Sequence, residues 1–343
     1  MIPSKQHSPL NLLFTALVLL GLLMPLHQHL DQLGALDAEF FGRVQMVELV
    51  SNFRYFVLHD QLFNKVIAAA DGWLVHASAI STDDYQRSDP LTAEELALIQ
   101  TRLQEVSDRL KAENIQLYLV VAPNKNTIYP EKVPAELKVL GDETRLDQLS
   151  AYLRANLDVP LLDLRPDLLA AKEDYQVYYR TDTHWNEIGA FIAYRAIAGR
   201  LAQDFPAVKP HALSDFSRVP LTYSGDMTRT AGNLHLKEES ETLQPLFTPQ
   251  ADIDTHATDT EVLFDAYVTT DNPNAQLPRA LIYRDSFFTD LLPFLAEHFS
   301  HAECFWTYDY NLSSDLQTQP DLVIIEFTER SIHQLLQSEI ILE

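Results

Sequence analysis

Short, uninterrupted apolar runs are the feature of this sequence that most constrains its fold. Residues 117–121 read Leu-Tyr-Leu-Val-Val and residues 322–327 read Leu-Val-Ile-Ile-Glu-Phe. Strands that are buried on both faces of a parallel sheet have this pattern. Helical patterns at residues 142–156, 186–201 and 287–299 alternate with strand-like segments at 159–164 and 280–283. The alternation predicts an α/β fold of three layers, α/β/α, around a mainly parallel sheet.

The segments before the first long run have weaker patterns. Residues 38–70 show mostly helical spacing, residues 71–75 predict a turn into a short strand, and the polar stretch 81–90 predicts a loop. Thr92 and Glu95 form a capping-box pattern at the start of a long amphipathic helix. The predicted α/β domain spans residues 38–343.

Residues 205–278 interrupt the alternation. They hold several prolines, and the stretch 238–278 contains nine acidic residues without a lysine or arginine. We interpret the region as an irregular insertion of loops and short strands whose acidic side chains are solvated.

The N-terminal end predicts export. Residues 10–26 are almost wholly apolar, Lys5 precedes them, and Asp31, Asp37 and Glu39 follow. This charge asymmetry favours a cytoplasmic N-terminus with the rest of the chain in the periplasm or outside. Residues 1–30 are therefore a signal anchor in the inner membrane or a cleaved signal peptide, and a buried helix of a soluble protein is the third possibility. The one cysteine, Cys304, excludes an intrachain disulfide and has the setting of a small core residue.

The net charge of −24 excludes one class of partner. Such an excess of negative charge repels phosphate backbones, so no nucleic-acid partner is expected. It also argues against a polyanionic substrate unless basic residues gather at the site.

Three residues together could activate a hydroxyl. Asp182 and His184 are two apart, so an extended segment presents both on one side. Ser286 follows the predicted strand 280–283 and precedes the helix 287–299. Serine, histidine and aspartate in this relation make a nucleophile with its base and orienting acid. Ser286 could instead be a helix N-cap, a role that Asp285 could also fill. Asp182 and His184 could bind a metal, but no further histidine or cysteine stands at ligand spacing, so none is predicted.

Four neighbouring residues are candidates for contacts to substrate or to an oxyanion. Asn124 and Lys125 follow the end of the run 117–121, Arg284 precedes Asp285, and Gly225 lies in the Tyr-Ser-Gly-Asp stretch 223–226. Each has a simpler explanation as well: a surface charge for Lys125 and a turn for Gly225.

The motifs resemble those of a known family. Residues 181–186 (Thr-Asp-Thr-His-Trp-Asn), the later Arg-Asp-Ser-Phe of 284–287 and the Asp-Gly-Trp-Leu of 71–74 look like the alginate O-acetyltransferase family, within the SGNH-hydrolase-like proteins that share a D-x-H-W motif. The resemblance runs from about residue 71 to 330. It implies a triad of Ser286, His184 and Asp182 in a circularly permuted order. Arg284 stands where many relatives have glycine.

The resemblance implies a periplasmic enzyme that transfers acetyl groups to hydroxyls of an exopolysaccharide through an acetyl-serine, without a cofactor. It also implies that a multi-pass membrane acyltransferase supplies the acetyl donor. A carbohydrate acetylesterase with the same triad, and a non-catalytic, anchored polysaccharide-binding or assembly protein, stay open as alternatives.

Overall fold

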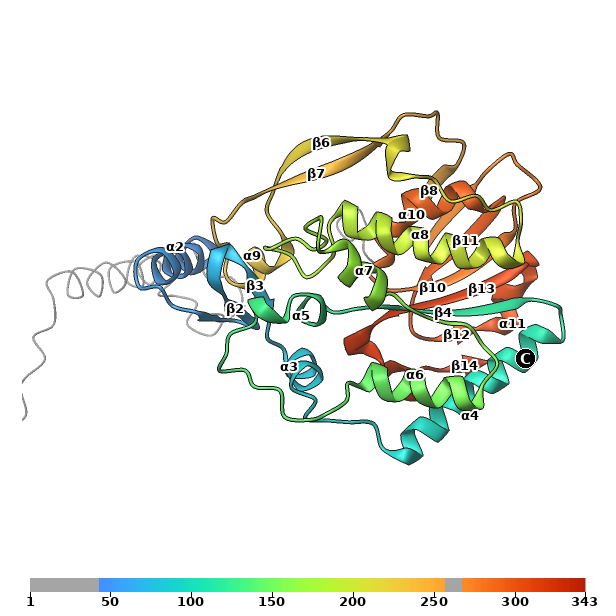
Figure 1. Ribbon diagram of the computed structural model, residues 1–343, viewed down its shortest axis with the longest axis horizontal. Coiled ribbons are helices and arrows are strands. Elements are labelled where there is room, and N and C mark those ends of the chain that lie inside the picture. The colour runs from blue at the N-terminus through green and yellow to red at the C-terminus, as the bar shows by residue number, and fades with distance from the viewer. Residues whose placement is uncertain (1–42, 257–266, 343) are drawn as a thin grey trace, which may run out of the picture.

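A seven-stranded sheet forms the centre of the molecule (Figure 1). The computed structural model describes residues 43–256 and 267–342. The strand order is β5-β4-β13-β10-β11-β9-β8; the first five strands are mutually parallel, and β9 pairs antiparallel with both β11 and β8. The strands are β4 Gln116–Ala122, β5 Leu161–Asp163, β8 Asp252–His256, β9 Tyr267–Asp271, β10 Arg279–Arg284, β11 His301–Trp306 and β13 Leu322–Thr328.

Alternate side chains of the central strands supply two separate cores. In β4, Tyr118 and Val120 pack into the core beneath one helical layer, whereas Leu119 and Val121 pack into the core on the other face. The first layer contains α7 Arg165–Ala171, α8 Glu187–Asp204 and α10 Phe288–Leu295, and the second contains α4 Ala93–Lys111, α6 Arg145–Asn156, α11 Leu312–Asp315 and α12 Gln334–Gln337. The predicted three-layer α/β fold with a mainly parallel sheet is therefore confirmed, as is the capping box of Thr92 and Glu95.

A smaller unit packs beside the sheet, on the left in Figure 1. It consists of α2 Arg43–Phe56, the antiparallel strands β1 Leu62–Phe63, β2 Val66–Ala68 and β3 Leu74–His76, and the short helix α9 Asp226–Thr230. The prediction of mostly helix over residues 38–70 is wrong beyond Phe56, because the chain forms a hairpin there. The stretch 81–90 is also mispredicted, since α3 Ala79–Gln86 begins after a Ser78 N-cap.

The interruption at residues 205–278 has more structure than predicted. Strands β6 Phe216–Tyr223 and β7 Glu238–Pro245 pair as a long antiparallel ribbon that lies over α8 (Figure 1). Strands β8 and β9 then extend the main sheet, so this part of the predicted irregular insertion is regular structure. Glu238 is 2% exposed, which contradicts the interpretation that the acids here are all solvated.

Other short elements include α5 Lys125–Ile128 and the paired strands β12 Tyr310–Asn311 and β14 Ile340–Ile341. Cys304 is fully buried, as predicted, and burial raises the pKa of its thiol to about 12. Among residues 43–256 and 267–342, no helix has the length and apolar character to cross a membrane. The predicted signal segment, residues 1–30, lies outside the described residues.

Candidate active site

Ser286 lies where β10 ends and the chain turns into α10, at the carboxyl edge of the parallel strands, where ligands bind in open α/β sheets. The Asp285 carboxylate holds this turn: Oδ1 accepts from Phe287 N at 2.9 Å, and Oδ2 accepts from Thr328 N at 2.9 Å. Ser286 does not cap α10, which has no side-chain cap. The N-cap interpretation of Ser286 is therefore wrong, and its hydroxyl points elsewhere.

That hydroxyl lies at the end of a hydrogen-bonded chain. Ser286 Oγ is 2.8 Å from His184 Nε2, and His184 Nδ1 is 2.6 Å from Asp182 Oδ1. This arrangement lets an imidazole accept the serine proton while the carboxylate holds the ring's other nitrogen. Burial works against protonation of His184, but the hydrogen bond and charge of Asp182 outweigh it and raise the pKa of the imidazole.

Asp182 is held as an anion by further donors. Its Oδ1 accepts from the backbone N–H of His184 at 3.0 Å, and its Oδ2 accepts from Tyr223 Oη and Asp226 N, both at 2.8 Å. Burial alone would raise the pKa of this carboxyl. The bonds to His184, with its charge, and the N–H of Asp226 outweigh burial and keep the pKa well below its usual range.

The loop that bears Asp182 is fixed from below. Lys125 is buried, and its Nζ donates to the carbonyl oxygens of Tyr179, Arg180 and Asp182 at 3.2, 3.1 and 2.7 Å. Glu238 of β7 accepts from Thr181 N at 2.8 Å and from Thr181 Oγ1 at 2.6 Å. Both sides of the loop are thereby tied to the scaffold.

The four further candidates have other roles in the structure. The surface-charge interpretation of Lys125 is wrong, since the side chain is a buried clamp. Asn124 donates from Nδ2 to Asp84 and accepts from Arg330, and it lines a different small hollow from that of Ser286. The amide of Gly225 donates to Thr181 Oγ1 at 3.0 Å. The donors of these three residues are thus engaged internally instead of facing an oxyanion.

Arg284 is buried beneath the site. Its guanidinium lies 4.6 Å from the ring centroid of Trp306, and Nη1 donates to Thr289 Oγ1 at 3.1 Å. Trp306 and Thr289 both line the cleft at Ser286, whereas Arg284 itself does not. The large residue in place of glycine therefore supports the cleft from behind.

The cleft has a volume of about 420 Å³ and an acidic lining. Besides the hydrogen-bonded residues Asp182, His184 and Ser286, the cleft is lined by Tyr179, Tyr223, Asp226, Arg229, Thr289, Asp290 and Trp306. Sequence reasoning missed Tyr223, Asp226 and Asp290 as site residues. Asp290 had a detectable signal, because it stands four residues after Ser286 at the start of a helix. Burial raises the pKa of Asp290 to about 6, although the nearby His184 opposes the shift.

Asp226 adds a third potential metal ligand to Asp182 and His184. One ligand atom each from Asp182, His184 and Asp226 lies within 4.8 Å of the others. The oxygens of Asp226 already accept from Thr183 N at 2.8 Å and from Thr183 Oγ1 at 2.6 Å. A cation would have to displace these bonds and the Asp182–His184 contact. The three residues are therefore better described as part of the hydrogen-bond network of the site than as a metal centre.

Comparisons with known proteins agree with the fold and motifs. Residues 66–272 match the sequence model of a family described as "SGNH hydrolase-like domain, acetyltransferase AlgX". The matched range includes Asp182 and His184 and ends before Ser286. A "Probable alginate O-acetylase AlgJ" of Pseudomonas syringae pv. tomato is 30% identical over 177 residues, which are 50% of this chain and 43% of that protein. The chain thus spans less than half of that relative's length.

Solved structures show the same fold. A DHHW family protein from Eubacterium siraeum superposes with a TM-score of 0.60 at 14% identity, covering 81% of this chain and 97% of its own. Bacillus cereus PatB1 gives a TM-score of 0.56 at 19% identity, covering 78% and 96%. At these identities the likeness concerns the fold alone.

Proposed function

Because the chain belongs to the family of SGNH hydrolase-like domains of the acetyltransferase AlgX type, we propose that it is an O-acetyltransferase that acetylates hydroxyls of an exopolysaccharide through an acetyl-Ser286 intermediate. The observation that carries the proposal is the continuous chain from Ser286 Oγ through His184 to Asp182, with contacts of 2.8 and 2.6 Å. The relatives named as probable alginate O-acetylases support the class of reaction.

In the first half-reaction, Ser286 Oγ attacks the carbonyl carbon of an acetyl donor while His184 Nε2 takes the hydroxyl proton. The tetrahedral intermediate collapses, the donor's leaving group receives the proton from His184, and acetyl-Ser286 remains. Asp182 keeps the imidazole in the tautomer that accepts at Nε2, and it stabilises the imidazolium that forms.

In the second half-reaction, a sugar hydroxyl takes the place of the leaving group. His184 removes its proton as the oxygen attacks the acetyl carbonyl, and the proton returns to Ser286 Oγ when the ester bond breaks. Every step uses residues of this chain without net consumption of a proton. Water in place of the sugar would give a carbohydrate acetylesterase.

Export of the domain is part of the proposal. The apolar residues 10–26 and the acids that follow them favour a periplasmic domain, anchored in the inner membrane if the segment is retained. A multi-pass membrane acyltransferase is the proposed source of the acetyl donor, because the inner membrane would separate a periplasmic site from cytoplasmic acetyl carriers.

The test separates transfer, hydrolysis and loss of catalysis. The purified chain is incubated with an activated acetyl ester, with and without a neutral oligosaccharide. Mass spectrometry then follows acetyl on Ser286, acetyl on sugar and free acetate. Ser286→Ala is expected to lower turnover about 10³-fold or more, while Ser313→Ala, at an exposed serine, serves as the control. Free acetate as the only product in every condition would identify an esterase, and full activity of Ser286→Ala would exclude the mechanism.

A further inference from the structure

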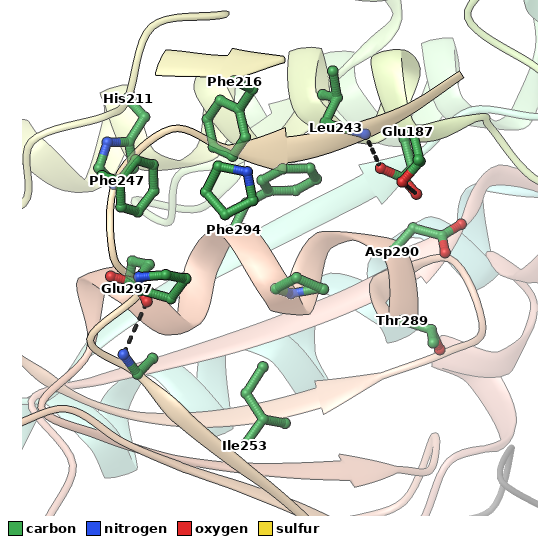
Figure 2. Close-up of a pocket in the computed structure, with 15 residues that line it drawn as sticks. Glu187, His211, Phe216, Leu243, Phe247, Ile253, Thr289, Asp290, Phe294 and Glu297 are labelled. Atoms are coloured by element: carbon green, nitrogen blue, oxygen red, sulfur yellow. Dashed lines mark hydrogen bonds between the residues drawn. The ribbon is translucent and has the colours of Figure 1, made fainter. Parts of the chain in front are cut away.

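A second pocket of about 390 Å³ adjoins the cleft at Ser286. Thr289 and Asp290 line both spaces, so they form the boundary between them. Figure 2 shows the pocket between α10, the β6–β7 ribbon and the segment that leads into β8. A molecule bound there can therefore extend to within reach of the Ser286 hydroxyl.

The walls of this pocket are mainly aromatic and aliphatic. Phe216 comes from the ribbon, Phe294 from α10 and Phe247 from the segment after β7 (Figure 2). The imidazole of His211 stacks on Phe247 with ring centroids 4.3 Å apart and an angle of 12° between the planes. Ile253, 39% exposed, lies at the open side. Aromatic and aliphatic walls of this kind suit the apolar face of a sugar ring, whose C–H groups pack against the faces of aromatic rings.

The acidic side chains of the pocket are three carboxylates, those of Glu187, Asp290 and Glu297. Glu187 is engaged by Thr242 Oγ1 and Leu243 N, both at 2.6 Å, and Glu297 by Gln250 N and Ala251 N, each at 2.9 Å. These two carboxylates hold the ribbon and the β8 segment in place. The Asp290 side chain, by contrast, makes no hydrogen bond to another of the described residues. Its carboxylate faces the boundary of the two spaces and can accept a hydrogen bond from a ligand hydroxyl.

The charged side chains that line the cleft and the pocket indicate the class of ligand. The described lining of cleft and pocket together contains five carboxylates, those of Asp182, Glu187, Asp226, Asp290 and Glu297, against the single guanidinium of Arg229. A polyuronate would bring further carboxylates next to these groups and meet like-charge repulsion. An uncharged sugar offers hydroxyl donors and meets none.

We propose that this pocket is the acceptor subsite and that it binds an uncharged sugar ring of the glycan, with Asp290 accepting a hydrogen bond from a hydroxyl of the ring. The inference rests on the proposed acetyl transfer and adds to it the class of acceptor. The aromatic wall supplies affinity, and Asp290 orients the ring so that a neighbouring hydroxyl points toward Ser286.

Two variants test the subsite. Phe247→Ala removes the ring that stacks on His211, and Leu246→Ala is the matched control, because Leu246 is the adjacent residue, 68% exposed and outside the pocket lining. The acceptors are a neutral gluco-oligosaccharide and a uronate oligosaccharide of the same length. Phe247→Ala is expected to raise the KM for the neutral acceptor about 10-fold with a smaller change in kcat. Leu246→Ala should match the wild type, and the uronate should be the poorer acceptor.

A binding measurement separates this inference from the proposed function. Calorimetry with the Ser286→Ala protein reports binding of the neutral oligosaccharide without turnover, and adding Phe247→Ala should weaken that binding by the same factor. If binding behaves so while the wild-type protein forms no acetyl-Ser286 with the activated ester, the subsite stands and the transferase function falls. Equal affinities of the two proteins, or a uronate acceptor used as well as the neutral one, would overturn the subsite whatever the activity.

Discussion

Gly225 offers the sharpest test of how the Asp182 loop is positioned. Its backbone is close to two parts of that loop, so an added Cβ would lie 2.4 Å from the carbonyl oxygen of Thr181 and 2.5 Å from Asp182 Cβ. Ordinary contact begins near 3.4 Å. Neither neighbour is the end of a flexible side chain, so the substitution Gly225→Ala must displace the backbone that carries Asp182.

The size of the effect follows from this overlap. Relief of the clash requires a shift of about 1 Å, and a misplacement of about 1 Å in a catalytic group costs about 10²-fold in rate. That factor corresponds to about 2.7 kcal/mol of activation free energy. Overpacking also lowers the free energy of unfolding by about 1–3 kcal/mol, so the chain should stay folded at 25 °C.

The assay is kcat/KM for an activated acetyl ester, measured well below the Tm that circular dichroism gives for each variant. Gly199→Ala is the control, since an added Cβ at that position in α8 meets nothing within 4 Å. It should leave kcat/KM unchanged and stabilise the helix by up to about 1 kcal/mol. A folded Gly225→Ala protein with kcat/KM within about threefold of wild type would refute the reasoning, because the acid's position would then not limit the rate.

Three further substitutions probe the same site. Asp226→Asn removes a negative charge 4.0 Å from His184 Nδ1. Because that charge helps to raise the pKa of His184, and the catalytic base must be neutral, the acid limb of the kcat/KM–pH profile should move to lower pH. An acid limb that stays at the wild-type pH would contradict this. Lys125→Met leaves three buried carbonyls without their donor and should lower the free energy of unfolding by about 1–3 kcal/mol in urea denaturation, with Lys138→Met at an exposed site as the control. Tyr223→Phe removes one donor to Asp182 but keeps the ring that stacks on Tyr179 with centroids 4.0 Å apart. We therefore expect kcat to fall up to about 10-fold while the Tm stays at the wild-type value. A Tm that falls together with kcat would indicate a structural role instead.

Strong periodicity explains which elements were predictable. The strands β4, β10 and β13 follow from apolar runs because both of their faces are buried, and α4 follows from its capping box and apolar stripe. Strand β8 gives no such signal, since all five of its residues are exposed. Helix α3 was missed because its polar sequence has little apolar periodicity and depends on the Ser78 cap.

Local spacing likewise limits what could be predicted of the site. Asp182 and His184 stand two residues apart, and Ser286 stands at a strand-to-helix junction, so sequence alone indicated all three. Tyr223 and Asp226 reach Asp182 from more than forty positions away, through a fold that no local pattern specifies. Lys125 resembles a surface residue in the sequence, and its burial depends on the three carbonyls that the fold brings around it.

The β6–β7 ribbon contacts both the Asp182 loop and the proposed acceptor subsite. Tyr223 and Glu238 are paired across one end of the ribbon, where Tyr223 donates to Asp182 and Glu238 accepts from Thr181. Toward its other end, Phe216 and Leu243 line the second pocket. One antiparallel element therefore both orients the acid behind His184 and forms a wall of the proposed acceptor subsite.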